Sequence, residues 1–134
     1  MRNDDIIFIV NAYRTLKSKN VEINLPASVA WKRRLNIKEL IKANETIHEA
    51  LQEISDRYSD DEHSDKKTVT NPDGTEKETR VVKPEYINEF LEAQNGVVLQ
   101  ETDVTIRKVK IEELGDIELS DEMLDTIDFM IEEN

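Results

Sequence analysis

Two histidines are the residues of this chain best suited to acid–base or metal chemistry. His48 and His63 lie 15 residues apart, which matches no common spacing of metal ligands. His48 falls within a predicted helix, beside its apolar face, and we expect it to be a half-buried surface residue. His63 follows three acids in the segment 60–63, and hard divalent cations prefer such oxygen ligands. The segment lacks the alternating ligands and fixed glycine of a calcium loop, so we expect a solvated acidic loop and no metal.

No catalytic nucleophile or phosphate-binding loop can be recognised. No serine lies in a nucleophile elbow, and the three glycines form no glycine-rich loop. Acid pairs such as Glu112 and Glu113 are common, but we expect nothing nearby to desolvate one of them and raise its pKa, as a general acid requires. We therefore expect no enzymatic activity, no catalytic residues and no cofactor.

Composition predicts one domain in a reducing cytoplasm. A chain of 134 residues can bury roughly two thirds of its unfolded surface. Aromatic residues make up only 5%, so the core must consist mainly of Ile, Leu and Val. The absence of cysteine and of a signal peptide favours the cytoplasm, and no apolar run approaches the ~20 residues of a membrane span.

The negative charge is concentrated at one end of the chain. Residues 1–110 carry a net charge of −2, whereas residues 111–134 hold ten acids and no base. A protein that contacts phosphates needs a dominant basic face, so we expect no direct nucleic-acid binding. Acidic segments of this kind commonly either solubilise a protein or meet a basic partner.

Apolar periodicity predicts a helical hairpin at the N-terminus. Ile6, Ile9, Val10, Tyr13 and Leu16 recur at helical spacing, although a strand over residues 6–10 is the rival interpretation. A second, longer helix is predicted from Pro26 to Tyr58, with a heptad-like apolar seam. The members of that seam are Ile37, Leu40, Asn44, Ile47, Leu51, Ile54 and Tyr58.

The long helix outreaches its neighbour. Its far end would extend past the first helix, which favours pairing with a second copy. Asn44, a polar residue within the seam, either fixes the register of the packed helices or lies at an exposed edge.

Turn and capping signals organise the second half of the chain. The segment Asn71-Pro72-Asp73-Gly74 predicts a tight turn between arms at 67–70 and 76–82. A short helix should begin at Pro84 and end at Asn95-Gly96. Extended segments are expected at 97–101 and 104–111, the second with a bulge near residue 107, and a final helix should begin at the capping residue Ser120.

The only tryptophan belongs to a second face of the long helix. Around the helix, Trp31 falls opposite the seam, among cations, so it must be covered or form a binding surface. The acidic terminal helix, in its own chain or a neighbour's, is one candidate cover; the loop before Pro26 or the extended segments are the other. The partner-binding residues predicted here are Trp31, Arg33, Arg34, Leu35, Lys38 and Lys42, together with Asp121, Asp125 and Asp128.

These elements predict an α+β fold. It comprises an N-terminal helical hairpin with one long helix, a small antiparallel β element and a short acidic C-terminal helix. We expect residues 1–134 to form a single domain, with a polar hairpin insertion at about 59–82 and an acidic segment at 111–134.

Four features mark the order of these elements: Asn11-Ala12-Tyr13, the helix start at Leu25-Pro26, Arg57-Tyr58, and Leu119-Ser120 before the acidic helix. Together, their order and spacing resemble a family of small proteins of unknown function encoded by tailed phages of Gram-positive bacteria. The polar segment 60–80 is longer than the loops associated with that family. The resemblance implies an accessory part in particle or tail assembly, in the host cytoplasm or the virion, through contacts with other phage proteins and with itself.

A second class of function is the alternative to a part in assembly. An acidic surface can imitate DNA phosphates, so an inhibitor of a host defence system or nuclease is the alternative.

Overall fold

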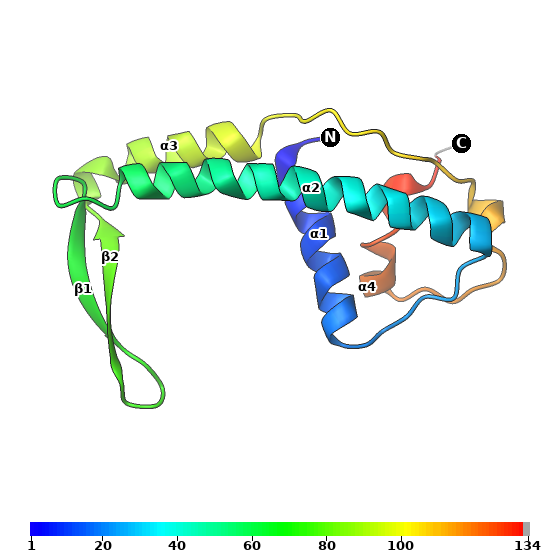
Figure 1. Ribbon diagram of the computed structural model, residues 1–134, viewed down its shortest axis with the longest axis horizontal. Helices are drawn as coiled ribbons and strands as arrows, with labels where there is room; N and C mark the ends of the chain where they lie inside the picture. The colour runs from blue at the N-terminus through cyan, green and yellow to red at the C-terminus, as the bar shows by residue number, and fades with distance from the viewer. Residues whose placement is uncertain (133–134) are drawn as a thin grey trace. The chain divides into compact units, whose positions relative to one another are not determined.

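The computed structural model describes residues 1–132 and has the predicted α+β architecture (Figure 1). A helical hairpin is followed by a two-stranded antiparallel sheet and by short helices, and the long helix has 31 residues. Among the described residues, no helix combines the length and apolar character that a membrane span requires. The elements are α1 (Asn3–Ser18), α2 (Ala27–Arg57), β1 (Ser64–Thr70), β2 (Glu76–Val82), α3 (Ile87–Val98) and α4 (Asp121–Leu124), with 3-10 helices at Pro84–Tyr86, Ile111–Leu114 and Asp128–Met130.

The chain divides into two compact units. The first comprises Met1–Thr46 and Glu101–Asn134, and the second comprises Ile47–Gln100. The boundary falls inside α2, which contributes its first part to one unit and its last part to the other. The prediction of a single domain over residues 1–134 stays a prediction.

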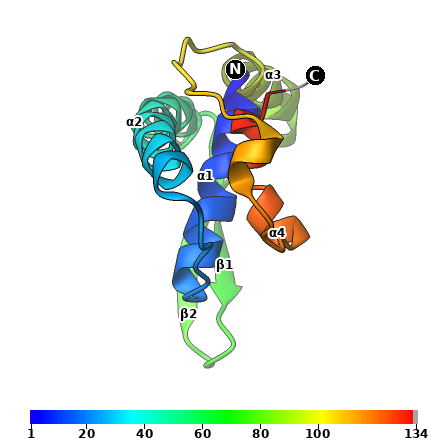
Figure 2. The ribbon, with the colours of Figure 1, turned by 90° about the vertical axis from the view of Figure 1, so that its right-hand side faces the viewer.

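Helix α1 forms where the apolar periodicity places it. Ile6, Ile9, Val10 and Leu16 are buried, so the helix is confirmed and the rival strand over residues 6–10 is wrong. The spacing of three and four residues places these side chains on one face, where they pack into the first unit. Within that unit α1 crosses α2 near the middle of the long helix, and α4 lies beside α1 (Figures 1 and 2).

The predicted seam of α2 is buried and begins earlier than expected. Ile37, Leu40, Asn44, Ile47 and Ile54 are each at most 4% exposed, which confirms the heptad-like spacing. Two further positions extend this face toward the N-terminus of the helix, since the side chains of Val29 and Asn36 are completely buried.

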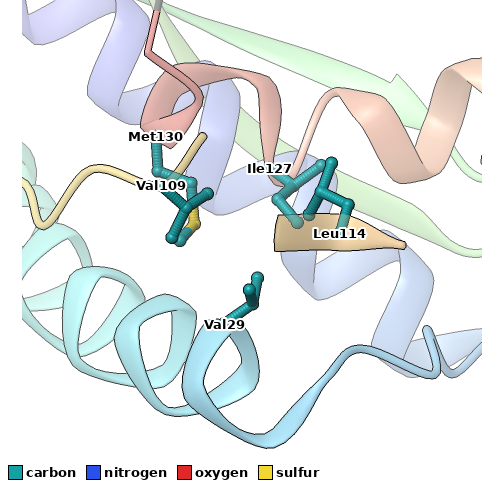
Figure 3. Close-up of a cluster of buried hydrophobic side chains, with 5 residues drawn as sticks. All are labelled: Val29, Val109, Leu114, Ile127 and Met130. Carbon is teal, nitrogen blue, oxygen red and sulfur yellow. The ribbon is translucent and has the colours of Figure 1, made fainter. Parts of the chain in front are cut away.

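The core of the first unit joins α2 to the two C-terminal segments. Val29 packs in one cluster with Val109, Leu114, Ile127 and Met130 (Figure 3). The Val109 amide donates to the Met130 carbonyl at 2.9 Å, and the Glu132 amide donates to the Val109 carbonyl at 2.8 Å. These bonds hold residues 130–132 against the segment around residue 109, so this segment is part of the core.

The strands predicted at 97–101 and 104–111 do not form. Val97 and Val98 are the last residues of α3, and the second segment makes only an isolated bridge, from Val109 to Ile131. At the position of the expected bulge, the side chain of Asn36 binds both backbone groups of Arg107. A side chain therefore takes the place that a neighbouring strand would occupy.

The terminal helix is shorter than its apolar pattern predicts. Ser120 caps it as expected, accepting a hydrogen bond from the Met123 amide at 3.3 Å. The α-helix ends at Leu124, after which the Thr126 hydroxyl donates to the Met123 carbonyl at 2.7 Å. The chain then turns into the 3-10 helix Asp128–Met130. After this break, Ile127 and Met130 both lie in the core cluster.

The second unit confirms the predicted hairpin and corrects the end of α3. Strands β1 and β2 pair in register from Ser64–Val82 to Thr70–Glu76, and Gly74 in the connecting turn has a φ of 87°. Glycine tolerates this left-handed conformation without a steric penalty. Helix α3 runs through Gly96 to Val98, so the cap predicted at Asn95-Gly96 is wrong. The ring of Tyr58, at the end of α2, contacts Phe90 of α3 at 5.4 Å between centroids.

Candidate protein-interaction surface

An exposed tryptophan and three cations lie on the face of α2 opposite the seam. Trp31 is 61% exposed, and Arg34, Lys38 and Lys42 follow it at helical spacing as exposed residues. Leu35 is half-buried between them. Within residues 1–132, no hydrogen bond or ion pair engages the side chains of Trp31, Arg34, Lys38 or Lys42. We call these five residues the Trp31 face.

Arg33 does not belong to this face. Its Nη2 donates to the Thr126 hydroxyl at 3.0 Å, and its guanidinium lies 5.5 Å from the centre of the Tyr13 ring. Burial lowers the pKa of Arg33, an effect that Tyr13 partly opposes. In the described part of the chain, its Nε is buried without a hydrogen-bond partner. Arg33 therefore links α2 to α1 and the terminal segment, and its place among the partner-binding residues stays a prediction.

Neither predicted cover lies over Trp31 in its own chain. The terminal segment packs instead on the seam side of α2, where Ile127 and Met130 share a cluster with Val29. An indole that is 61% exposed is not buried by the preceding loop or by the segment 104–111 either. The prediction of cover within one chain is wrong because Val29 and Asn36 extend the apolar seam and attract the terminal segment to the other side.

The predicted acids are exposed but do not meet the Trp31 face of their own chain. Asp121 and Asp125 lie at the two ends of α4, and Asp128 begins the last 3-10 helix. The ion pair observed for this segment joins Glu122 to Lys19 of the turn after α1, with Nζ–Oε1 at 3.1 Å. The acidic segment thus forms an ion pair with the turn after α1 and, within residues 1–132, none with the cations of the Trp31 face.

A cationic groove adjoins the Trp31 face. It has a volume of about 450 Å³ and lies between the side chains of α1 and α2. Arg34 and Lys38 belong to both the groove and the Trp31 face. Because Arg34 and Lys38 are both positively charged and lie one helical turn apart, they would favour a carboxylate-rich partner over a neutral one. The groove is lined by Tyr13, Lys17, Ala30, Arg33, Arg34, Ile37, Lys38 and Ile41.

A second concavity, which sequence reasoning missed, lies on the other side of α1. We call it the acid-rimmed pocket: about 230 Å³, with Phe8, Ala12 and Leu16 as apolar lining and Glu122 and Asp125 as acids. Asn11 and Thr15 complete its lining. Phe8 is 56% exposed although it is a large apolar residue. One feature of the sequence could have revealed this pocket: Phe8 and Ala12 are four residues apart, which places them together on α1 beside its buried apolar face.

The acidic turn before β1 brings three metal-ligating groups together. Donor atoms of Asp60, Glu62 and His63 lie within 4.8 Å of one another. The Nδ1 atom of His63 is 2.6 Å from Oδ1 of Asp60, and this hydrogen bond is the main cause that lowers the pKa of Asp60. The two acids are exposed, and exposed acids commonly cluster without an ion. We therefore assign no metal to this turn.

Comparison with known proteins identifies no relative. No protein-family model, no curated protein and no solved structure matches this chain.

Proposed function

We propose that this chain is a non-enzymatic accessory or structural protein of tailed phages that acts by protein–protein interaction in particle or tail assembly. The observation that carries the proposal is the 61% exposed Trp31 beside Arg34 and Lys38. Exposing a large aromatic side chain to water is unfavourable unless a partner covers it, and Trp and Arg are enriched among residues that dominate binding energy. The class of partner, other phage proteins, follows from the resemblance of the order of elements to that of the tailed-phage family.

The charge of the surface indicates the kind of partner. Because the cations of the Trp31 face have no acid partners within residues 1–132, a negatively charged protein surface would complement them. Such a protein would act in the host cytoplasm or in the virion, where the other phage proteins assemble.

Affinity capture from phage-infected cells tests this proposal. Tagged wild-type protein should recover other phage proteins, identified by mass spectrometry, and Trp31→Ala should lose them. The matched control is Ile111→Ala, which removes another exposed apolar side chain, 56% exposed, outside the Trp31 face. If Trp31→Ala recovers the same proteins as wild type, the Trp31 face is not the partner site and the proposal fails.

A second candidate is an acidic inhibitor of a host defence system or nuclease. It is favoured by one observation: all the acids between residues 112 and 132 are exposed, with no base among them. An exposed acidic surface can occupy a basic groove that would otherwise bind DNA phosphates. Capture of a host nuclease, lost on charge reversal at Asp121 and Asp128 and retained by Trp31→Ala, would favour this function over assembly.

A further inference from the structure

We propose that the occupant of the acid-rimmed pocket is Trp31 of a second copy of this chain. This inference rests on the proposed function, because it assumes that the Trp31 face binds protein. The surface that would bind Trp31 is the wall of α1 formed by Phe8, Ala12 and Leu16, with Glu122 and Asp125 beside it.

The Trp31 face has the form of a projecting anchor. The indole is 61% exposed at the start of α2, and the nearest exposed cation on the same side is Arg34, one turn further along the helix. Lys38 follows after another turn. An aromatic side chain flanked by cations can enter an apolar pocket only if the rim of that pocket accepts positive charge.

The acid-rimmed pocket satisfies that condition. Its wall is predominantly apolar, and exposed Phe8 could stack with an incoming ring. Asp125 has no hydrogen-bond or ion-pair partner for its carboxylate among the described residues, so it is free to accept from a guanidinium. Glu122 is engaged by Lys19 at 3.1 Å, but both side chains are more than half exposed, and an exposed pair of this kind contributes little.

Both surfaces belong to the first unit, so every copy carries one anchor and one pocket. Trp31 is exposed and does not occupy the pocket of its own chain. Anchor and pocket are different surfaces, and a contact between them is therefore head-to-tail. Repetition of a head-to-tail contact closes into a ring or continues as a filament. Self-assembly of this type agrees with a part in building a larger particle.

The contact should be weak as an isolated pair. Burying one aromatic side chain removes about 150–250 Å² of surface, whereas a stable interface usually buries about 800 Å² on each partner. We therefore expect concentration-dependent association, and its attractive charge component should weaken with added salt.

Complementation between two blocked variants tests the proposal. Trp31→Ala removes the anchor and keeps the pocket, whereas Ala12→Arg fills the pocket and keeps the anchor. Sedimentation should show that wild type associates at about 0.1–1 mM, a range suited to weak complexes, and that each variant alone is a monomer. An equimolar mixture should form dimers and nothing larger, because each pair has only one intact contact. Ile111→Ala should associate like wild type.

The single tryptophan supplies a second readout. In the mixture, the Ala12→Arg chain carries the only indole, and its emission should shift to the blue when it enters the pocket of the Trp31→Ala chain. Asp125→Lys gives an independent block of the pocket that changes charge with no bulk at the wall. Circular dichroism should show the wild-type helix content for every variant.

Three outcomes would overturn the proposal: a monomeric wild type at the highest concentration, undiminished association of Trp31→Ala, or no complex from the mixture although both variants are folded. These results are distinguishable from failure of the proposed function. If wild type is a monomer but Trp31→Ala still loses its phage partners in infected cells, the Trp31 face binds another protein and only self-assembly is excluded.

Discussion

The buried side chain of Asn36 binds both backbone groups of Arg107. Its Nδ2 donates to the Arg107 carbonyl at 3.0 Å, and its Oδ1 accepts from the Arg107 amide at 2.9 Å. Asn36 is fully buried on α2, and its partner lies 71 residues away. One amide side chain therefore supplies the pairing that a strand would provide and anchors the segment after α3 to the first unit.

Asn36→Ala should destabilise the protein by about 2–4 kcal/mol, because each buried backbone group left without a partner costs about 1–3 kcal/mol. The free energy of unfolding from urea titration, followed by circular dichroism, measures the loss. Gln52→Ala is the control: this exposed side chain donates to Asp56 on the surface, and its removal should change stability by less than about 0.5 kcal/mol. Equal effects of the two changes would contradict the anchoring role of Asn36.

Replacing Asn44 should have the opposite effect on stability to replacing Asn36. It is fully buried in the seam, and within the described residues neither Nδ2 nor Oδ1 has a hydrogen-bond partner. Asn44→Leu should therefore raise the free energy of unfolding by about 1 kcal/mol or more, since it removes an unsatisfied polar group and adds apolar contact. Urea titration again measures the change. A marked loss of stability would show that the amide makes an interaction in solution that Leu cannot replace.

Trp31→Ala should leave the fold intact. An exposed side chain contributes little to the core, so we expect a change below about 0.5 kcal/mol, whereas Val29→Ala, two positions earlier and fully buried, should cost about 2 kcal/mol. For monomeric protein at low concentration, the fluorescence maximum of native Trp31 should already lie near that of the unfolded chain. A loss of several kcal/mol on truncating Trp31 would mean that the indole is covered.

Deleting residues 120–134 should unfold the first unit. If these residues were only a detached acidic tail, their deletion would leave the fold intact. The deletion removes Ile127 and Met130 from the core cluster, and losing either large side chain costs about 2–5 kcal/mol. Near-ultraviolet circular dichroism and hydrogen exchange of α1 report the loss. Ser120→Ala, which removes only the cap, should cost about 1 kcal/mol. A deletion variant with native exchange protection in α1 would show that the cluster is not needed.

The hairpin of the second unit should tolerate shortening. Replacing residues 67–79 with Asn-Gly keeps the pair Lys66–Arg80 and the bonds of Arg80 to Ser64 and Asp61. The removed residues are exposed except for half-buried Asn71, so unfolding should stay cooperative and change by less than about 1 kcal/mol. Calorimetry measures both quantities. Loss of a cooperative transition would mean that the outer hairpin supports the fold.

Two neighbouring aspartates should titrate below their ordinary value of 3.8 for different reasons. A hydrogen bond from His63 lowers the pKa of Asp60, and a hydrogen bond from Arg80 lowers the pKa of Asp61. A pKa that folding depresses gives stability that is present above the unfolded pKa and is lost as the pH falls through the folded pKa. In carboxyl NMR titrations, His63→Ala should raise the pKa of Asp60 and Arg80→Ala that of Asp61. If the two variants leave both titrations unchanged, these pairs are absent in solution.

Local patterns were sufficient to predict the helices and the hairpin. The apolar spacing of α1 and α2, the turn at residues 71–74 and the cap at Ser120 all appear in the structure near their predicted places. Backbone hydrogen bonds of a helix join residues four apart, and a tight turn depends on the φ of one or two residues, so neighbouring residues carry this information. The position of Trp31 on the face opposite the seam follows from the same periodicity.

Only the tertiary structure decided which distant segment each face meets. Val29 and Asn36 were not recognised as part of the seam, because the segments that bury them lie more than 70 residues away. The end of α4 at Leu124 also depends on this packing, since it allows Ile127 to enter the cluster. Amphipathic periodicity specifies that a face is buried, but long-range side-chain contacts select its partner; here they placed the acidic segment against α1 and left the Trp31 face open.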